Sequence, residues 1–145
     1  MTRVLFVEDE DAPLEGLRRS LYREQSKWRM VFVGSGELAV AELEREPCDV
    51  IVADMRMPGM DGIEGVRLIK ARYPAARILM QTVFDDDAKI FDAIRAGASG
   101  YILKTASTEE MMKAIRDVHA GGSAMTPAIA FKVLELFRAI TPTQR

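Results

Sequence analysis

The 145-residue sequence has one cysteine, one histidine and no long hydrophobic run. Because Cys48 has no partner in the chain, an internal disulfide is excluded, and we expect a structural role for this thiol rather than a redox one. No apolar run approaches the roughly 20 residues of a membrane-spanning helix, and no charged segment leads into an apolar one as in a signal peptide. These absences predict a cytoplasmic protein.

The sequence also lacks an excess of positive charge, since 20 lysines and arginines stand against 22 aspartates and glutamates. A formal net charge of -2 does not provide the basic surface that DNA binding requires, so we expect any DNA contact to come from another segment. Hydrophobic residues make up 48% of the chain and charged residues 29%, which is ordinary for a globular protein. We therefore expect one independently folding domain.

Short apolar runs recur along the chain, separated by segments long enough for a helix each. Such continuous runs suit strands that crossover helices bury on both faces. Four of these runs are Val4–Val7, Val50–Ala53, Ile78–Met80 and Tyr101–Leu103. A fifth candidate strand, Trp28–Val33, contains Arg29, and this charged residue indicates a strand at the edge of the sheet. The pattern predicts an α/β fold, a doubly wound five-stranded parallel sheet of the flavodoxin-like (βα)5 type with strand order 2-1-3-4-5.

Hydrophobic residues at helical spacing mark the segments between these runs. Gly97 and the pair Gly121 and Gly122 are expected helix ends. Thr126 and Pro127 are typical of an N-cap and a first helical residue, so an extra C-terminal helix follows the five units. The stripes are Leu14, Leu17 and Leu21; Ile63, Val66 and Ile69; Ile90 and Ile94; Met111, Ile115 and Val118; and, in the extra helix, Ala130, Val133, Leu134 and Phe137.

Acidic residues follow two of the predicted strands. The run Glu8-Asp9-Glu10-Asp11 comes directly after the first apolar run, and Asp54 directly after Val50–Ala53. Because the carboxyl ends of parallel strands meet at one edge of a sheet, these carboxylates should share a crevice, where their repulsion calls for a cation. Magnesium, or manganese, prefers such hard oxygen ligands. Taken alone, either acidic group would equally suit a solvated turn or a helix cap.

Two further polar residues end predicted strands: Lys104 follows the fifth and Thr82 the fourth. Either side chain can bind an oxyanion, through a compact positive charge or a hydroxyl donor. Taken separately, each would be an ordinary polar residue at the end of a strand. Together with a carboxylate and a divalent metal, they suggest nucleophilic attack of Asp54 on phosphorus to give an acyl phosphate.

This ordered set resembles the receiver domains of two-component response regulators over nearly the entire chain. The resemblance is carried by Val4 to Glu10, Val50 to Gly62, Thr82, and Gly97 to Lys104. It implies phosphotransfer from a sensor histidine kinase to Asp54. It also implies metal ligation by Asp9, Asp54 and the backbone carbonyl of Arg56, with water-mediated help from Glu8. Such a domain is regulatory rather than an enzyme, although it takes part in its own magnesium-dependent phosphotransfer and autodephosphorylation.

The resemblance further implies a readout in which Thr82 turns toward the phosphoryl group and Tyr101 changes rotamer. The alternative for Tyr101 is a half-buried aromatic residue on an edge strand. Two features depart from the commonest receiver pattern. Thr105 follows Lys104 where many relatives have a cis-proline, and Arg56 places a long cation at the mouth of the site, which leaves the phosphoryl lifetime open.

The chain resembles the NarL/FixJ subgroup, whose receivers precede a LuxR-type helix-turn-helix domain. The resemblance lies in the segment from Tyr101 to Thr105, in Gly121 and Gly122, and in the extra helix. The tail Ile140–Arg145 is similar to the opening of that domain, because Thr-Pro is a good helix start. We therefore expect a receiver at 1–122, a helix and linker at 123–139, and the start of a truncated output domain at 140–145. A stand-alone receiver with a frayed end is the alternative.

In the full-length protein, phosphorylation would control a DNA-binding transcription regulator. The expected partners are a histidine kinase, DNA only through the output domain, and a second receiver in a homodimer, with no membrane contact.

Three other functional classes stay open. A flavodoxin-like cofactor module needs a glycine-rich phosphate loop where Glu8-Asp9 stands. A phosphohydrolase needs a second general acid or base beside Asp54, and none is evident. A degenerate receiver used only for constitutive dimerisation would not need the complete acidic set.

Overall fold

The computed structural model describes residues 2–8, 16, 18–19, 21, 28–54, 56–57, 60–82 and 87–139. For residues 56–57, 60–62 and 87–89 it describes the backbone alone. Of the first predicted helical stripe, Leu14 and Leu17 lie outside the described residues, and Leu21 is buried. No helix in the described ranges is long and apolar enough to cross a membrane.

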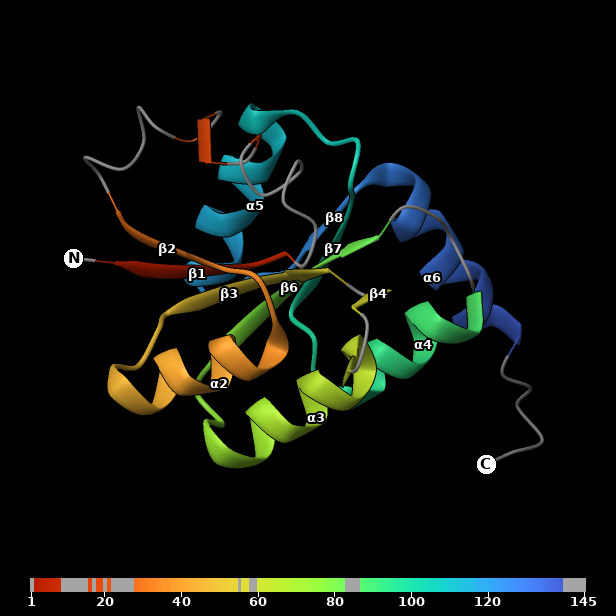
Figure 1. Cartoon of the computed structure of the whole chain (residues 1–145). Coiled ribbons are helices and arrows are strands. Elements are labelled where there is room, and N and C mark those ends of the chain that lie inside the picture. Colours follow the sequence, from red (N-terminus) through yellow and green to blue (C-terminus); the bar gives the residue numbers. More distant parts are fainter. Residues whose placement is uncertain are drawn as a thin grey trace.

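A parallel sheet with the strand order β2-β1-β3-β6-β7-β8 forms the centre of the molecule (Figure 1). Its strands are β1 (Arg3–Val7), β2 (Arg29–Val33), β3 (Val50–Asp54), β6 (Arg77–Thr82), β7 (Gly100–Leu103) and β8 (Ala124–Met125). The first five follow the predicted order 2-1-3-4-5, and β2 lies at the edge as its charge pattern indicates. The doubly wound α/β prediction is therefore confirmed.

The short strand β8 was not predicted, and it pairs with β7 in register Gly100 to Ala124. A Cβ atom at residue 100 would lie 2.6 Å from the backbone oxygen of Ala124, far inside normal contact distance. Glycine at this position is thus what allows β8 to approach. As a result β7 is an interior strand, and the alternative in which Tyr101 stands on an edge strand is wrong.

Helices cover both faces of the sheet. Their bounds are α2 (Gly36–Arg45), α3 (Gly62–Arg72), α4 (Asp87–Ala96), α5 (Thr108–His119) and α6 (Pro127–Ala139). A two-stranded hairpin, β4 (Arg56–Met57) with β5 (Met60–Asp61), precedes α3. As predicted, α4 ends at Gly97, whose φ of +116° favours glycine, and α6 begins at Pro127.

Alternate strand residues point to opposite faces of the sheet and build two hydrophobic clusters. Leu5 and Val7 of β1 join the cluster under α2, α3 and α4, whereas Val4 and Phe6 join the one under α5. The predicted stripe of Met111, Ile115 and Val118 is buried on that second face. Both faces are covered because every central strand is apolar on both sides.

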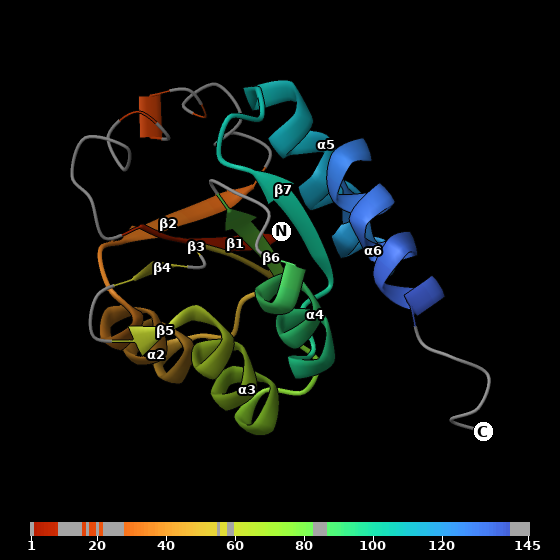
Figure 2. The same ribbon diagram turned by 90° about the vertical axis from the view of Figure 1, so that its right-hand side faces the viewer.

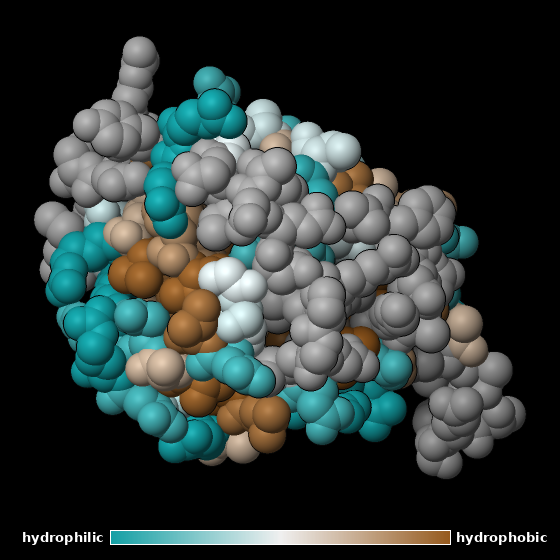
Figure 3. Space-filling view, in the orientation of Figure 1, coloured by the Kyte–Doolittle hydropathy of each residue, from teal (hydrophilic) through white to brown (hydrophobic). Residues whose placement is uncertain are grey.

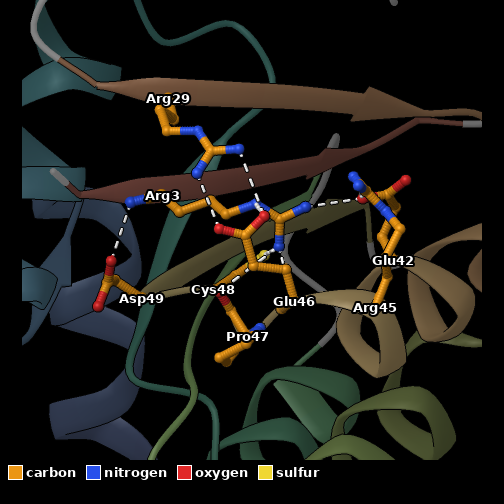
Figure 4. A network of polar contacts seen from close by, with 8 residues as sticks. All are labelled: Arg3, Arg29, Glu42, Arg45, Glu46, Pro47, Cys48 and Asp49. Atoms are coloured by element: carbon orange, nitrogen blue, oxygen red, sulfur yellow. Dashed lines mark hydrogen bonds and ion pairs between the residues drawn. The ribbon is translucent and has the colours of Figure 1, made fainter.

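A buried arginine ties the amino end of β1 to the end of α2 (Figure 4). The guanidinium of Arg3 donates to the Glu42 carboxylate at 2.7 Å, to the backbone carbonyl of Glu46, and to the sulfur of Cys48 at 3.0 Å. The neighbouring Arg29 also pairs with Glu46, at 2.8 Å, but is more than half exposed. The sequence pattern did not indicate a role for Arg3. Its burial makes it a structural anchor at the end of the sheet opposite the predicted site.

Cys48 should react slowly with thiol reagents in the folded chain. Burial raises the pKa of its thiol above the ordinary value of 9.0, although the nearby Arg3 charge acts in the opposite direction. At pH 8 we therefore expect labelling by an aromatic disulfide reagent, followed by absorbance, to be at least ~100-fold slower in buffer than in urea. Equal rates in both solutions would contradict the buried position.

An apolar cavity of about 160 Å³ lies between α2 and α3. It is lined partly by the small residues Gly36, Ala39 and Gly65, which leave the space between the two helices unfilled. Hydrophobic residues also gather on the surface over these helices (Figure 3). Leu68 of α3, which also lines the cavity, is half exposed.

Candidate functional site

Three charged side chains meet at the carboxyl edge of the sheet. Asp54 is the last residue of β3, Glu8 follows β1 and Lys104 follows β7. Because these strands run parallel, their carboxyl ends point the same way (Figure 1). Asp54 and Glu8 are buried, and Lys104 is partly buried. The structure thus brings together three residues that lie up to 96 positions apart.

Lys104 pairs with both carboxylates. Its Nζ lies 2.5 Å from Oδ2 of Asp54 and 3.1 Å from Oε1 of Glu8. One ammonium therefore serves two buried carboxylates, and the trio carries an excess of one negative charge when all three groups are ionised. Such an excess, held mostly out of water, favours a further cation.

The pKa values reflect this imbalance. Burial raises the pKa of Glu8 above its ordinary 4.5, and the Asp54 charge adds to this, while Lys104 acts in the opposite direction without cancelling it. For Lys104, burial disfavours the ammonium, but hydrogen bonds and charges from Asp54 and Glu8 outweigh burial and raise its pKa above 10.5. Lys104 is therefore a fixed positive charge beside Asp54.

Thr82 ends β6 at the same edge, and its side chain is buried. Its backbone carbonyl accepts a hydrogen bond from the N–H of Lys104 at 2.7 Å, which links the two predicted oxyanion-binding residues. The preceding Gln81 is also buried and stands in register with Asp54 on β3. Gln81 was not among the predicted site residues, although a polar residue directly after the run Ile78–Met80 was a signal for it.

Tyr101 lies in the middle of β7 and is completely buried. It shares a hydrophobic cluster with Ile90 of α4 and Ile129 of α6. Its hydroxyl has no hydrogen-bond partner among the described residues, and burial, with the charge of Asp92, raises its pKa. The half-buried alternative is incorrect, because β8 and α6 close the side of β7 that was expected to be open.

The predicted metal ligands are described only in part. Asp9 lies outside the described residues, and Arg56 is placed by its backbone in β4, paired with Asp61. Within the described ranges no three acidic, histidine or cysteine side chains cluster as a metal site. The two carboxylates that are described, Glu8 and Asp54, do fit magnesium, because they are hard oxygen donors with excess negative charge. The Lys104–Thr105 peptide bond is trans.

Comparisons with known proteins place this geometry in context. Residues 4–116 match the family described as response regulator receiver domain. A LuxR-family two-component response regulator from Aurantimonas superposes with a TM-score of 0.83 at 34% identity, over 93% of this chain and 97% of that one. The isolated receiver domain of RcsB from Salmonella enterica, at 21% identity and a TM-score of 0.78 over 90% of this chain and 97% of that one, supports the fold alone.

Curated relatives are longer proteins. The transcriptional regulatory protein LnrK of Bacillus subtilis is 33% identical over 92% of this chain and 61% of its own length. The response regulator protein VraR of Staphylococcus aureus is 35% identical over 90% of this chain and 63% of its own. The chain therefore spans about three fifths of the length of the relatives it matches.

Proposed function

The chain belongs to the response-regulator receiver domain family of two-component systems, and on that premise we propose that it is a phosphorylation-operated switch whose phosphoacceptor is Asp54. The observation that carries the proposal is the ion-paired trio at the carboxyl edge of the sheet, in which Lys104 contacts both Asp54 and Glu8. A buried carboxylate beside a fixed ammonium is the arrangement that an acyl phosphate requires.

In the transfer step, a carboxylate oxygen of Asp54 forms a bond to phosphorus while the bond between phosphorus and the donor atom breaks. The donor would be a phosphohistidine of a sensor kinase, whose imidazole nitrogen leaves with the electron pair. Lys104 would then exchange part of its pairing with Asp54 for the transferred oxygens. The hydroxyl of Thr82, at the end of the neighbouring strand, would donate a hydrogen bond to another oxygen.

Receiver domains bind a divalent metal, and magnesium or manganese is our proposal for this chain. Asp9, Asp54 and the backbone carbonyl of Arg56 would hold it, with Glu8 acting through water. When bound, the metal offsets the negative charge of the donor and of Asp54. The excess negative charge of the described trio supports this assignment. Autodephosphorylation would use the same residues, with water as the acceptor.

The readout would pass through Thr82 and Tyr101. A Thr82 side chain drawn toward the phosphoryl group would vacate space in the interior, and Tyr101 would change rotamer, so that phosphorylation selects one of two packed states. The Tyr101 hydroxyl, which is buried without a hydrogen-bond partner in the part of the chain that the structure describes, supports this role, since an unsatisfied polar group makes its present position costly.

We propose that residues 1–122 form the receiver, that 123–139 connect it to an output domain, and that 140–145 begin a LuxR-type helix-turn-helix domain. Response-regulator receivers interact with histidine kinases, and LuxR-type regulators bind DNA. In the full-length protein, DNA contact would belong to the output domain, because this segment has a net charge of -2. The expected place of action is the cytoplasm.

Incubation with acetyl phosphate and magnesium should add one phosphoryl group per chain. Intact-protein mass spectrometry would detect the adduct, and the same reaction with a chelator should give at least ~100-fold less product, because without a cation the carboxylates repel the anionic donor. Borohydride trapping followed by peptide mapping should locate the modified residue at 54. An unchanged mass in the presence of magnesium would contradict the proposal.

A further inference from the structure

The apolar cavity between α2 and α3 is bounded by side chains that are too short to fill it. Gly36 and Ala39 of α2 and Gly65 of α3 form part of its wall. On the sheet side, Ile51 of β3 and Ile78 of β6 line it. Figure 2 shows α2 and α3 together on one side of the sheet, opposite α5. The cavity therefore lies between two helices and one face of the sheet.

Polar groups are scarce in this cavity. Among the described residues that line it, only Arg72 and Tyr73 carry polar side-chain atoms. The guanidinium of Arg72 is already engaged, because its Nη1 lies 3.1 Å from Oε1 of Glu44 and it stands 5.9 Å from the centre of the Tyr73 ring. The backbone groups of β3 on the sheet side are paired with the neighbouring strands. A buried water needs about two to four polar partners, so the interior of this cavity suits an apolar occupant better than water.

The volume of the cavity sets the size of a suitable occupant. Its 160 Å³ is close to the roughly 150 Å³ of an engineered apolar cavity that stays dry and binds benzene or xenon. Empty space deprives the wall atoms of dispersion contacts. An apolar molecule that entered would restore these contacts and would leave water at the same time. The cavity thus fits a molecule of about one aromatic ring.

The cavity reaches the surface, because Leu68 and Arg72 line it and are 50% and 58% exposed. Hydrophobic residues gather on this surface (Figure 3). The ion pair of Arg72 with Glu44 joins α3 to α2 beside the opening. Since both partners are more than half exposed, the pair adds little stability and can open. A free small molecule can pass such a gate more easily than a side chain held on a partner protein.

We propose that this cavity is a binding site for a small, uncharged aromatic molecule of about one ring. The proposal goes beyond phosphorylation at Asp54 and does not depend on it. The sheet side of the cavity includes Val7 and Ala53. These residues directly precede Glu8 and Asp54, so a bound molecule would lie against the two strands that lead to the candidate functional site.

Fluorobenzene is the probe, because its fluorine NMR signal reports binding directly. Titration of the 145-residue chain should saturate with a dissociation constant of roughly 0.1–1 mM, as expected for a ligand of about seven non-hydrogen atoms. Ala39→Leu fills the cavity and should weaken binding at least ~10-fold. Ala71→Leu is the matched control, because Ala71 is exposed on α3 and does not line the cavity, and it should change the constant less than ~2-fold. Circular dichroism would verify that both variants are folded.

Methyl NMR locates the probe in the unchanged chain and needs no variant. Nuclear Overhauser effects should join the ring protons of fluorobenzene to the methyl groups of Val66 and Ile69, which line the cavity. The methyl groups of Ile115 and Val118 should show none, because they are buried on the opposite face of the sheet. No saturation up to the solubility limit of fluorobenzene, equal effects of the two alanine substitutions, or contacts at the α5 methyl groups instead would overturn the proposal.

Discussion

A chain carrying Asp54→Asn should take up no detectable phosphoryl group from acetyl phosphate and magnesium, a loss of at least ~100-fold relative to the unchanged chain. The amide keeps the shape of the side chain and can still accept a hydrogen bond from Lys104, but its oxygen is a poor nucleophile. Lys104 lies 2.5 Å from the Asp54 carboxylate, and the other carboxylate, Glu8, is held by the same ammonium. Intact-protein mass spectrometry measures the loss.

The matched control is Asp117→Asn. Asp117 lies on α5, pairs with Lys113 at 3.1 Å and is partly exposed, so the same chemical change there should leave phosphoryl uptake unaltered. Undiminished labelling of Asp54→Asn at another residue would reject Asp54 as the phosphoacceptor.

The Asp54→Asn variant should also be more stable than the unchanged chain in metal-free buffer. The neutral amide would leave Glu8 and Lys104 as a balanced pair in a buried setting, so we expect a gain of about 1 kcal/mol in the free energy of unfolding, because the uncompensated buried charge is removed. Magnesium should then stabilise the unchanged chain more than the variant, because a ligand that binds the folded state raises its stability. Urea denaturation with and without magnesium measures both effects.

Replacing Arg3 by methionine should lower the free energy of unfolding by about 2–4 kcal/mol. Methionine fills similar volume but leaves the backbone carbonyls of Glu46 and Pro47 without their donor, and unsatisfied buried groups are costly. The loss stays below the largest values for buried ion pairs, since Glu42 keeps its contact with Arg45 at 2.8 Å. Urea denaturation followed by circular dichroism gives the value.

Arg29→Met is the control, because Arg29 stands opposite Arg3 in the β1–β2 register and also contacts Glu46. Being more than half exposed, it should contribute less than about 1 kcal/mol. Phosphoryl uptake at Asp54 should persist in folded Arg3→Met, because Arg3 lies at the opposite end of the sheet. If the two variants lost the same free energy of unfolding, the burial of Arg3 would not add to stability, and the prediction would be wrong.

Much of the fold could be predicted from local patterns. The apolar runs gave the five strands, because a strand buried on both faces must be apolar throughout. The handedness of the crossovers then limited the strand order. The extra strand β8 escaped prediction because two residues carry no periodicity, and its pairing depends on the missing side chain of Gly100.

The candidate site was predictable to a comparable degree. Glu8, Asp54 and Lys104 were recognised because each directly follows an apolar run, and Thr82 because it stands two residues after one. Parallel strands bring such residues to one edge of the sheet. The depth of Tyr101 was not foreseen, since it depends on β8 and α6 closing over β7. Nor was the buried position of Arg3, because an arginine before an apolar run also suits an exposed strand start.

The sequence by itself thus determined which segments become strands and helices, and which polar residues end the strands, because periodicity and strand-end position are local properties. Only the tertiary structure decided that the ammonium of Lys104 contacts both Glu8 and Asp54, that Arg3 is enclosed, and that Phe131, Leu134 and Phe137 of α6 stay exposed. The physical reason is that each depends on contacts between residues far apart in the chain, and only packing fixes such distances.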